Sequence, residues 1–125
     1  MKKKILVVDD ELTTCVLLEH FLSSQYEVFT TNSVVEALTW LESNLPDLII
    51  SDIQMPKMDG YKAFELLKSK LDADVPIIAC TVHTNEMETT RDLGFTGFVS
   101  KPLDVTRFKQ QLARILNQQP VWDVD

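Results

Sequence analysis

The chain has 125 residues and a formal net charge of −7, with 12 Lys and Arg residues against 19 Asp and Glu residues. This is the length of one domain, and the negative charge argues against binding of nucleic acid or of an anionic membrane surface. No apolar stretch approaches the roughly 20 residues of a membrane span, and the first apolar run is too short for a signal peptide. We therefore expect a globular, cytoplasmic protein.

The first half of the chain predicts strands that alternate with helices. Residues 5–8 form an unbroken apolar run, which is typical of a strand buried on both faces of a parallel sheet. Apolar residues at spacings of three and four predict a helix over residues 12–22. A weaker strand over residues 26–30 follows, and then a helix over residues 34–45 with Ser33 as its N-cap.

The second half of the chain continues this alternation. Unbroken apolar runs predict buried strands at residues 48–50 and 77–80, and a weaker strand is expected at residues 97–100. Helical spacing of apolar residues predicts the remaining helices, over residues 61–71, 84–93 and 105–115. The pattern is weakest over residues 84–93, where Met87 and Leu93 are the clearly apolar residues.

Five strand–helix pairs in succession predict an α/β fold. The strands would form one five-stranded parallel sheet through right-handed crossovers, with helices on both of its faces. We expect residues 1–119 to form this domain and residues 120–125 to be a tail or linker. The carboxyl ends of all strands in such a sheet lie on one edge, and ligands bind in the crevice there.

Residues suited to phosphoryl chemistry follow the predicted strands. Asp9 and Asp10 come after the first strand, Asp52 after the third, Thr81 after the fourth and Lys101 after the fifth. Crowded carboxylates repel one another, and Mg²⁺ relieves this repulsion while it also binds phosphate oxygens. A carboxylate beside the metal can attack a phosphoryl group, whose oxygens suit an ammonium and a hydroxyl donor. One Asp after a strand is usually a turn or cap residue; the convergence of five residues favours a site.

With these residues assembled, the chain resembles the receiver domain of two-component response regulators, the CheY-like class. The resemblance covers about residues 3–117 and lies in four stretches, residues 5–11, 47–60, 76–81 and 97–102. The segment from Asp52 to Gly60 reads DIQMPKMDG and matches a D-x-x-M-P-x-M-D-G string. The resemblance implies a flavodoxin-like, doubly wound sheet of strand order 2-1-3-4-5.

The same resemblance implies a role for each acidic residue. Asp52 resembles the aspartate that is phosphorylated. Asp9 and Asp10 resemble the acidic pair that holds Mg²⁺ together with Asp52, and the backbone carbonyl of Gln54 resembles the third protein ligand. The expected metal ligands are therefore Asp9, Asp10, Asp52 and Gln54.

The polar and aromatic residues of the later strands also have counterparts in the family. Thr81 resembles the switch threonine that turns toward the phosphoryl group, and Lys101 resembles the lysine that pairs with that group. Phe98 matches the switch aromatic position, and the bond between Lys101 and Pro102 is cis in the family. Catalysis would be limited to self-phosphorylation and self-dephosphorylation, so we do not expect an enzyme that turns over a metabolite.

The resemblance implies two kinds of protein partner. A histidine kinase or phosphotransfer protein would supply the phosphoryl group. A downstream protein would bind the face formed by the helix of residues 84–93, the strand of residues 97–100 and the helix of residues 105–115. Neither the pathway nor the identity of these partners follows from the sequence.

Two departures from the family pattern keep an alternative open. Val82 stands where the family usually has a small residue, and the segment from Thr81 to Gly94 is shorter than usual. These features favour a pseudo-receiver, an interaction module that works without phosphorylation. A third candidate, a magnesium-dependent phosphohydrolase with an aspartate nucleophile, fits less well because residues 9–13 lack its D-x-D-x-T/V string.

Overall fold

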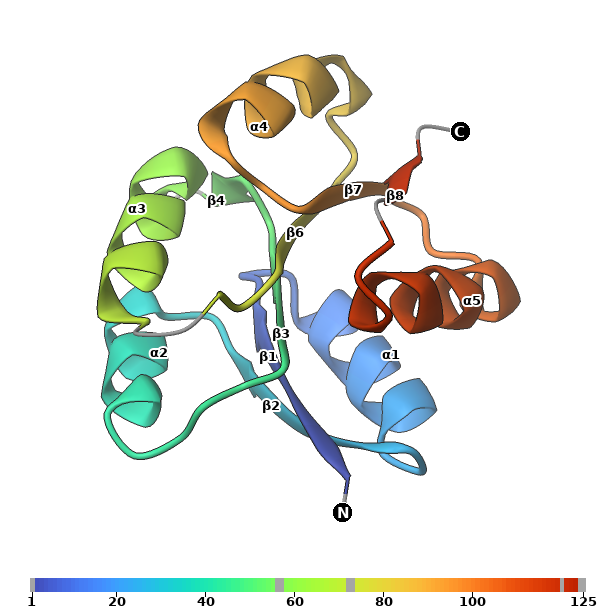
Figure 1. Ribbon diagram of the computed structural model, residues 1–125, viewed down its shortest axis with the longest axis horizontal. Helices are drawn as coiled ribbons and strands as arrows, with labels where there is room; N and C mark the ends of the chain where they lie inside the picture. Colours follow the sequence, from blue (N-terminus) through green and yellow to red (C-terminus); the bar gives the residue numbers. More distant parts are fainter. Residues whose placement is uncertain (1, 56–57, 72–73, 120, 124–125) are drawn as a thin grey trace.

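The structure, a computed structural model, describes residues 2–55, 58–71, 74–119 and 121–123. Within these residues, five α-helices surround one six-stranded parallel sheet (Figure 1). Pro56 and Lys57 of the DIQMPKMDG string lie outside the described residues, as do residues 120, 124 and 125 of the expected tail. No helix in the described part of the chain is long and apolar enough to cross a membrane.

The strands of the parallel sheet lie side by side in chain order, except that β2 lies outside β1 at one edge. Its order is β2-β1-β3-β6-β7-β8. Its strands are β1 (Lys3–Val8), β2 (Tyr26–Thr31), β3 (Leu48–Ser51), β6 (Ile77–Thr81), β7 (Gly97–Ser100) and β8 (Val121–Asp123). A separate antiparallel pair, β4 (Gln54–Met55) and β5 (Met58–Asp59), lies between β3 and the next helix.

Helices cover both faces of the sheet. They are α1 (Leu12–Leu22), α2 (Val34–Leu41), α3 (Gly60–Lys70), α4 (Met87–Leu93) and α5 (Val105–Leu116), and a 3-10 turn, η1 (Thr84–Glu86), precedes α4. The segment with the weakest helical pattern is thus divided between η1 and α4. Helix α2 ends at Leu41, earlier than predicted. Continuation of the helix to Leu45 is disfavoured by Pro46, whose ring disfavours a helical backbone at the preceding residue.

The predicted flavodoxin-like α/β fold is confirmed, but the predicted number of five strands is wrong. The first five sheet strands have the expected 2-1-3-4-5 order, and β8 adds a sixth strand parallel to β7. Three residues are too few to show strand periodicity, so only the return of α5 to the edge of β7 reveals this strand. The boundary between a domain of residues 1–119 and a tail stays a prediction.

The alternating side chains of the central strands build two cores. Ile5 and Val7 of β1 belong to the core beneath α1 and α5, whereas Leu6 and Val8 belong to the core beneath α2, α3 and α4. Figure 1 shows α1 and α5 on one side of the sheet and α2 and α3 on the other. Because both faces are covered, the carboxyl edge of the sheet remains as a place where polar groups can reach solvent.

Gly60 fixes the start of α3 close to this edge. A Cβ atom at residue 60 would lie 2.2 Å from the Cα atom of Ile53, so only glycine permits the approach. Asp59 caps the helix, because its side chain accepts a hydrogen bond from the amide of Tyr61 at 2.9 Å. The segment after β3 is therefore held in a tight return next to Asp52.

Candidate functional site

Backbone hydrogen bonds place the expected site residues at the ends of neighbouring strands. The amide of Asp9 donates to the carbonyl of Thr31 at 3.0 Å, and that of Asp52 donates to the carbonyl of Val8 at 3.0 Å. The amide of Lys101 donates to the carbonyl of Thr81 at 2.9 Å. These bonds continue the sheet by one residue and bring distant parts of the sequence to one edge.

Three carboxylates meet at this edge. Asp9, Asp10 and Asp52 each offer an oxygen atom that lies within 4.8 Å of the others. Asp9 and Asp52 are buried and Asp10 is exposed, so the cluster has a buried floor and one side open to solvent. An all-oxygen donor set of this kind suits a hard divalent cation such as Mg²⁺.

The side chains of Asp9 and Asp52 are each held by a hydrogen bond from the backbone amide two residues ahead. One oxygen of Asp9 accepts a hydrogen bond from the amide of Glu11 at 2.9 Å, and one oxygen of Asp52 accepts a bond from the amide of Gln54 at 2.9 Å. Such bonds from the backbone two residues ahead are typical of Asp in turns. They fix both carboxylates and bring the backbone of Gln54 beside Asp52, and the role of the Gln54 carbonyl as a metal ligand stays a prediction.

The ammonium of Lys101 lies among these carboxylates. Its Nζ atom is 2.9 Å from Oδ2 of Asp9, 3.0 Å from Oδ2 of Asp52 and 3.4 Å from Oε1 of Glu11. The side chain of Lys101 is only 7% exposed. One ammonium therefore forms ion pairs with three carboxylates. With Asp10 included, the carboxylates of the cluster outnumber its ammonium groups, so the cluster has a net negative charge.

Burial and charge shift the pKa values of these groups. Burial raises the pKa of Asp9, and the hydrogen bond from Lys101 offsets only part of this effect. Burial alone would lower the pKa of Lys101, but the hydrogen bond and charge of Asp9 and the charge of Asp52 outweigh it and raise that pKa. Lys101 is thus positively charged at neutral pH. A further cation would stabilise the ionised form of the buried carboxylates.

Glu11 is a member of the cluster that the sequence pattern did not single out. Besides contacting Lys101, its carboxylate accepts a hydrogen bond from the hydroxyl of Thr14 one turn into α1. These contacts lower the pKa of Glu11, the bond from Thr14 being the larger cause. The available signal was its place as the third acidic residue in succession after β1.

Thr81 and Phe98 lie on the adjacent strands. Thr81 is buried at the end of β6, where it pairs with Ser100 of β7, and its hydroxyl accepts a hydrogen bond from the amide of His83 at 3.2 Å. Phe98 is completely buried in the core beneath α4. Val82 is 60% exposed, so its side chain lies at the surface directly after Thr81.

The segment after Thr81 is fastened to α3. The hydroxyl of Tyr61 donates to Oε2 of Glu86 at 2.8 Å, and burial together with this bond raises the pKa of Tyr61. The aromatic ring of Tyr61 also packs edge-on against Phe95. This link, which the sequence pattern did not predict, holds η1 in place beside the site.

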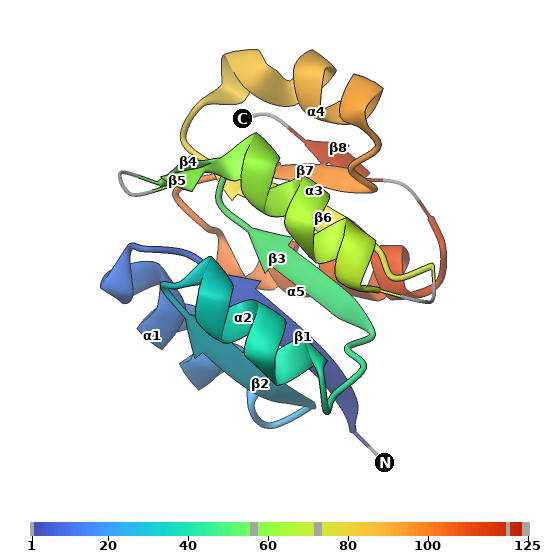
Figure 2. The same cartoon turned by 90° about the vertical axis from the view of Figure 1, so that its left-hand side faces the viewer.

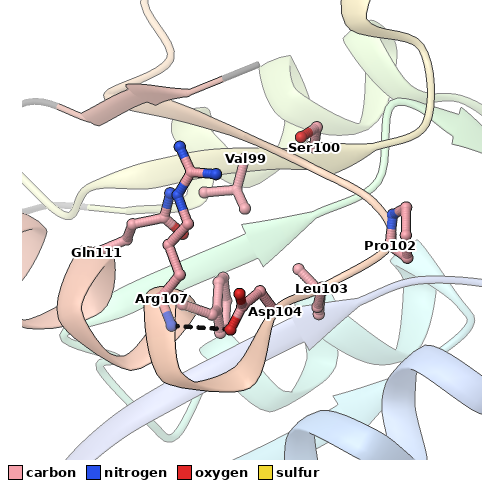
Figure 3. A pocket seen from close by; sticks show the side chains of 8 residues that line it. Val99, Ser100, Pro102, Leu103, Asp104, Arg107 and Gln111 are labelled. Atoms are coloured by element: carbon pink, nitrogen blue, oxygen red, sulfur yellow. Dashed lines mark hydrogen bonds between the residues drawn. The ribbon is translucent and has the colours of Figure 1, made fainter. Parts of the chain in front are cut away.

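A separate pocket lies between the end of β7 and the start of α5 (Figure 3). Val99 and Ser100 line one wall, and Arg107 and Gln111 of α5 line another. The start of α5 is capped by Asp104, whose side chain accepts a hydrogen bond from the amide of Arg107 at 3.2 Å. The peptide bond between Lys101 and Pro102 is cis, as the resemblance implied.

Known proteins with similar sequences belong to the family that the sequence motifs resemble. Residues 5–113 match the model of the response regulator receiver domain, and the chain therefore belongs to this family. It is 37% identical over 120 residues to a probable transcriptional regulator, ycf27, of Cyanophora paradoxa. The aligned region covers 94% of this chain and 49% of that protein. The chain thus spans about half the length of several curated relatives that it matches.

Solved structures give the same result. The chemotaxis response regulator CheY4 of Vibrio cholerae superposes with a TM-score of 0.80 at 29% identity, covering 92% of this chain and 99% of that chain. The receiver domain of the sensor histidine kinase PA1611 of Pseudomonas aeruginosa has a TM-score of 0.81 at 26% identity, covering 94% of this chain and 99% of that chain. That structure holds a magnesium ion in its active-site cleft. The chain is a receiver domain of two-component response regulators, and its aspartate cluster fits a phosphorylation site.

Proposed function

We propose that Asp52 accepts a phosphoryl group from a phosphohistidine donor. The observation that supports this most directly is the position of its carboxylate, which has the acidic pair Asp9 and Asp10 within 4.8 Å and the ammonium of Lys101 at 3.0 Å. Mg²⁺ would be held by Asp9, Asp10 and Asp52 and by the backbone carbonyl of Gln54. When bound, the ion would neutralise charge on the phosphoryl oxygens.

In the proposed transfer, an oxygen of Asp52 attacks the phosphorus in line with the leaving imidazole. A phosphorus–oxygen bond forms as the phosphorus–nitrogen bond breaks, and the donor histidine leaves with the electron pair of that bond. Lys101 exchanges its contact with the Asp52 carboxylate for one with a phosphoryl oxygen, so the developing charge keeps a partner. The anchored oxygen of Asp52, which accepts from the amide of Gln54, keeps the carboxylate from rotating.

The phosphoryl group would then act on Thr81 and Phe98. It carries close to two negative charges and three acceptor oxygens. The hydroxyl of Thr81 accepts from the amide of His83 and can still donate its own proton to a phosphoryl oxygen. Movement of Thr81 toward this oxygen favours the conformation in which Phe98 is buried, and the surface of α4, β7 and α5 changes its population of states.

The proposed partners follow from this chemistry. A histidine kinase or a phosphotransfer protein supplies the phosphoryl group at the open side of the cluster. A downstream protein binds the face of α4, β7 and α5, where β8 forms the outer edge of the sheet. Catalysis is confined to self-phosphorylation and self-dephosphorylation. We propose the cytoplasm as the compartment, since Cys15 and Cys80 are both free thiols of the kind that a reducing environment preserves.

Acetyl phosphate with Mg²⁺ tests the proposal without a protein donor. The parent chain is expected to gain the mass of one phosphoryl group, which Asp52→Asn does not gain. Omission of Mg²⁺ should abolish the change. Equal mass changes in the parent and in Asp52→Asn, or none in either, would refute phosphorylation at Asp52.

The pseudo-receiver is the less favoured alternative. It drew support from Val82 and from the short segment after Thr81. The complete set of acidic and basic groups at the site speaks against it, because a module that never carried a phosphoryl group has no need of a buried ammonium between two buried carboxylates. A chain that binds no Mg²⁺ at millimolar concentration would favour the pseudo-receiver.

A further inference from the structure

Strand β8 covers the outer edge of β7. It pairs with β7 in parallel, with Gly97 opposite Val121 and Phe98 opposite Trp122, and it lies beside β7 under α4 (Figure 2). Successive side chains of a strand point to opposite faces. Accordingly, Val121 is buried in the core beneath α5, and Trp122 packs against the core beneath α4.

A cation–π contact joins β8 to α4. The guanidinium of Arg91 lies 4.6 Å from the centre of the Trp122 ring, within the range of this attraction. Arg91 belongs to the last turn of α4, so α4 is connected to the rest of the fold through the indole of Trp122 as well as through its own core residues. The three-residue strand thus bridges both helices that flank β7.

The attachment of β8 is short enough to open locally. The strand has three residues and pairs with β7 on one side, and strands of this length add little stability by themselves. The connection from α5 passes through Gln118, whose φ of 65° lies in the left-handed region that residues other than glycine rarely adopt. Short elements that pair on one side open locally more readily than the central strands of a core.

Strand β7 connects β8 to the phosphorylation site. Phe98 lies on β7 directly opposite Trp122, and both contribute to the same core. Two residues further along β7, Ser100 pairs with Thr81, and Lys101 donates its amide to the carbonyl of Thr81. With Trp122 beside it on the same face, Phe98 cannot turn outward over the edge of β7 unless β8 leaves.

We propose that β8 is a detachable strand whose docking on β7 stabilises the buried conformation of Phe98 and thereby favours phosphorylation of Asp52. This inference rests on the proposed function, in which the phosphoryl group selects the same conformation. Coupling between two events is reciprocal. Docking of β8 therefore raises the affinity of the site for a phosphoryl group, and a phosphoryl group holds β8 more firmly on the sheet.

The first measurement is the binding of beryllofluoride, a phosphoryl analogue, to the full chain in the presence of Mg²⁺, followed by ¹⁹F NMR. Trp122→Ala is expected to bind it about fivefold more weakly than the parent, the lower end of common allosteric couplings. Trp122→Phe keeps a ring opposite Phe98 and should bind like the parent. Circular dichroism verifies that both variants are folded, since Trp122 lies at the edge of the core.

The second measurement is the reciprocal effect. Beryllofluoride should slow amide hydrogen exchange of residues 121–123 in the parent by about the same factor, and it should not do so in Asp52→Asn. If Trp122→Ala binds like the parent, or if exchange in β8 does not change, the coupling is refuted. If the parent itself does not bind beryllofluoride, the proposed function fails, and the coupling fails with it; the two failures are thus distinguishable.

Discussion

The Nζ atom of Lys101 lies 3.0 Å from Oδ2 of Asp52, a residue 49 positions earlier in the chain. This contact is nearly enclosed, since the two side chains are 7% and 8% exposed. The same ammonium is 2.9 Å from Asp9. Lys101 is therefore the counter-charge of two carboxylates that are buried side by side.

Replacement of Lys101 should destabilise the metal-free protein. Lys101→Met leaves Asp9 and Asp52 buried without their cation, and loss of one partner from a buried ion pair costs about 3 kcal/mol. Urea unfolding in the presence of a chelator measures the loss, which Mg²⁺ should partly reverse. The matched control is Lys70→Met, whose exposed contact with Glu42 contributes less than about 1 kcal/mol. Equal losses for the two variants would contradict the assigned role of Lys101.

Magnesium should stabilise the folded chain through the aspartate cluster. At about 100 times the dissociation constant, a ligand that binds only the folded state adds about 2.7 kcal/mol to the free energy of unfolding. Asp10→Asn and Asp52→Asn should reduce this gain, whereas Glu42→Gln, remote from the cluster, should preserve it. Thermal unfolding at several Mg²⁺ concentrations provides the measurement. A gain that is unaltered in Asp10→Asn would place the ion elsewhere.

Val82→Ala should change both directions of the phosphorylation reaction. Val82 directly follows Thr81 and is 60% exposed, so its methyl groups can hinder the approach of donor and water alike. A steric barrier of about 1 kcal/mol corresponds to about a fivefold change in rate. Phosphorylation by acetyl phosphate and decay after its removal should both be faster in the variant. Val35→Ala, at an exposed position of α2, should leave both rates unchanged.

Gly60→Ala should be strongly destabilising. Its Cβ atom would meet the backbone of Ile53 at 2.2 Å, and severe overlap with backbone cannot be relieved by a side-chain rotation, so we expect a loss of at least about 3 kcal/mol. Gly94→Ala is the comparison. A Cβ atom at residue 94 would meet only the flexible end of the Lys68 side chain, at 3.2 Å, and the φ of 108° there costs roughly 1 kcal/mol. Denaturant unfolding ranks the two variants. A smaller loss at Gly60 would show that the turn after Asp52 can widen.

The two buried thiols should resist alkylation and give a pH dependence at alkaline pH. Burial raises the pKa of Cys15 to about 11, from an ordinary value of 9.0, so at pH 8 only about one molecule in a thousand carries the thiolate that reacts. Stability from this group is complete below its unfolded pKa and is lost as the pH rises through its folded pKa. Iodoacetamide should therefore modify the folded chain far more slowly than the urea-unfolded chain. Cys80, which is buried more deeply, should react last.

The sequence determined the elements and the chemistry of this protein. Unbroken apolar runs such as residues 48–50 predicted strands covered on both faces. Successive side chains of a strand point to opposite faces, so an unbroken apolar run places apolar side chains on both faces of the sheet. The residues that follow these runs, Asp9, Asp52 and Lys101, could be assigned to one edge, because parallel strands all end there. The motif around Asp52 then identified the family, because a motif consists of residue types at fixed spacing and can be read directly from the sequence.

Only the tertiary structure decided which groups touch. The bond between Tyr61 and Glu86 and the approach of Glu11 to Lys101 depend on how loops fold over the sheet edge, and no periodicity records such contacts. Strand β8 is the clearest case. Its three residues have no pattern of their own, and they become a strand because α5 returns the chain to the unpaired edge of β7, where backbone hydrogen bonds and the contact between Trp122 and Arg91 hold them.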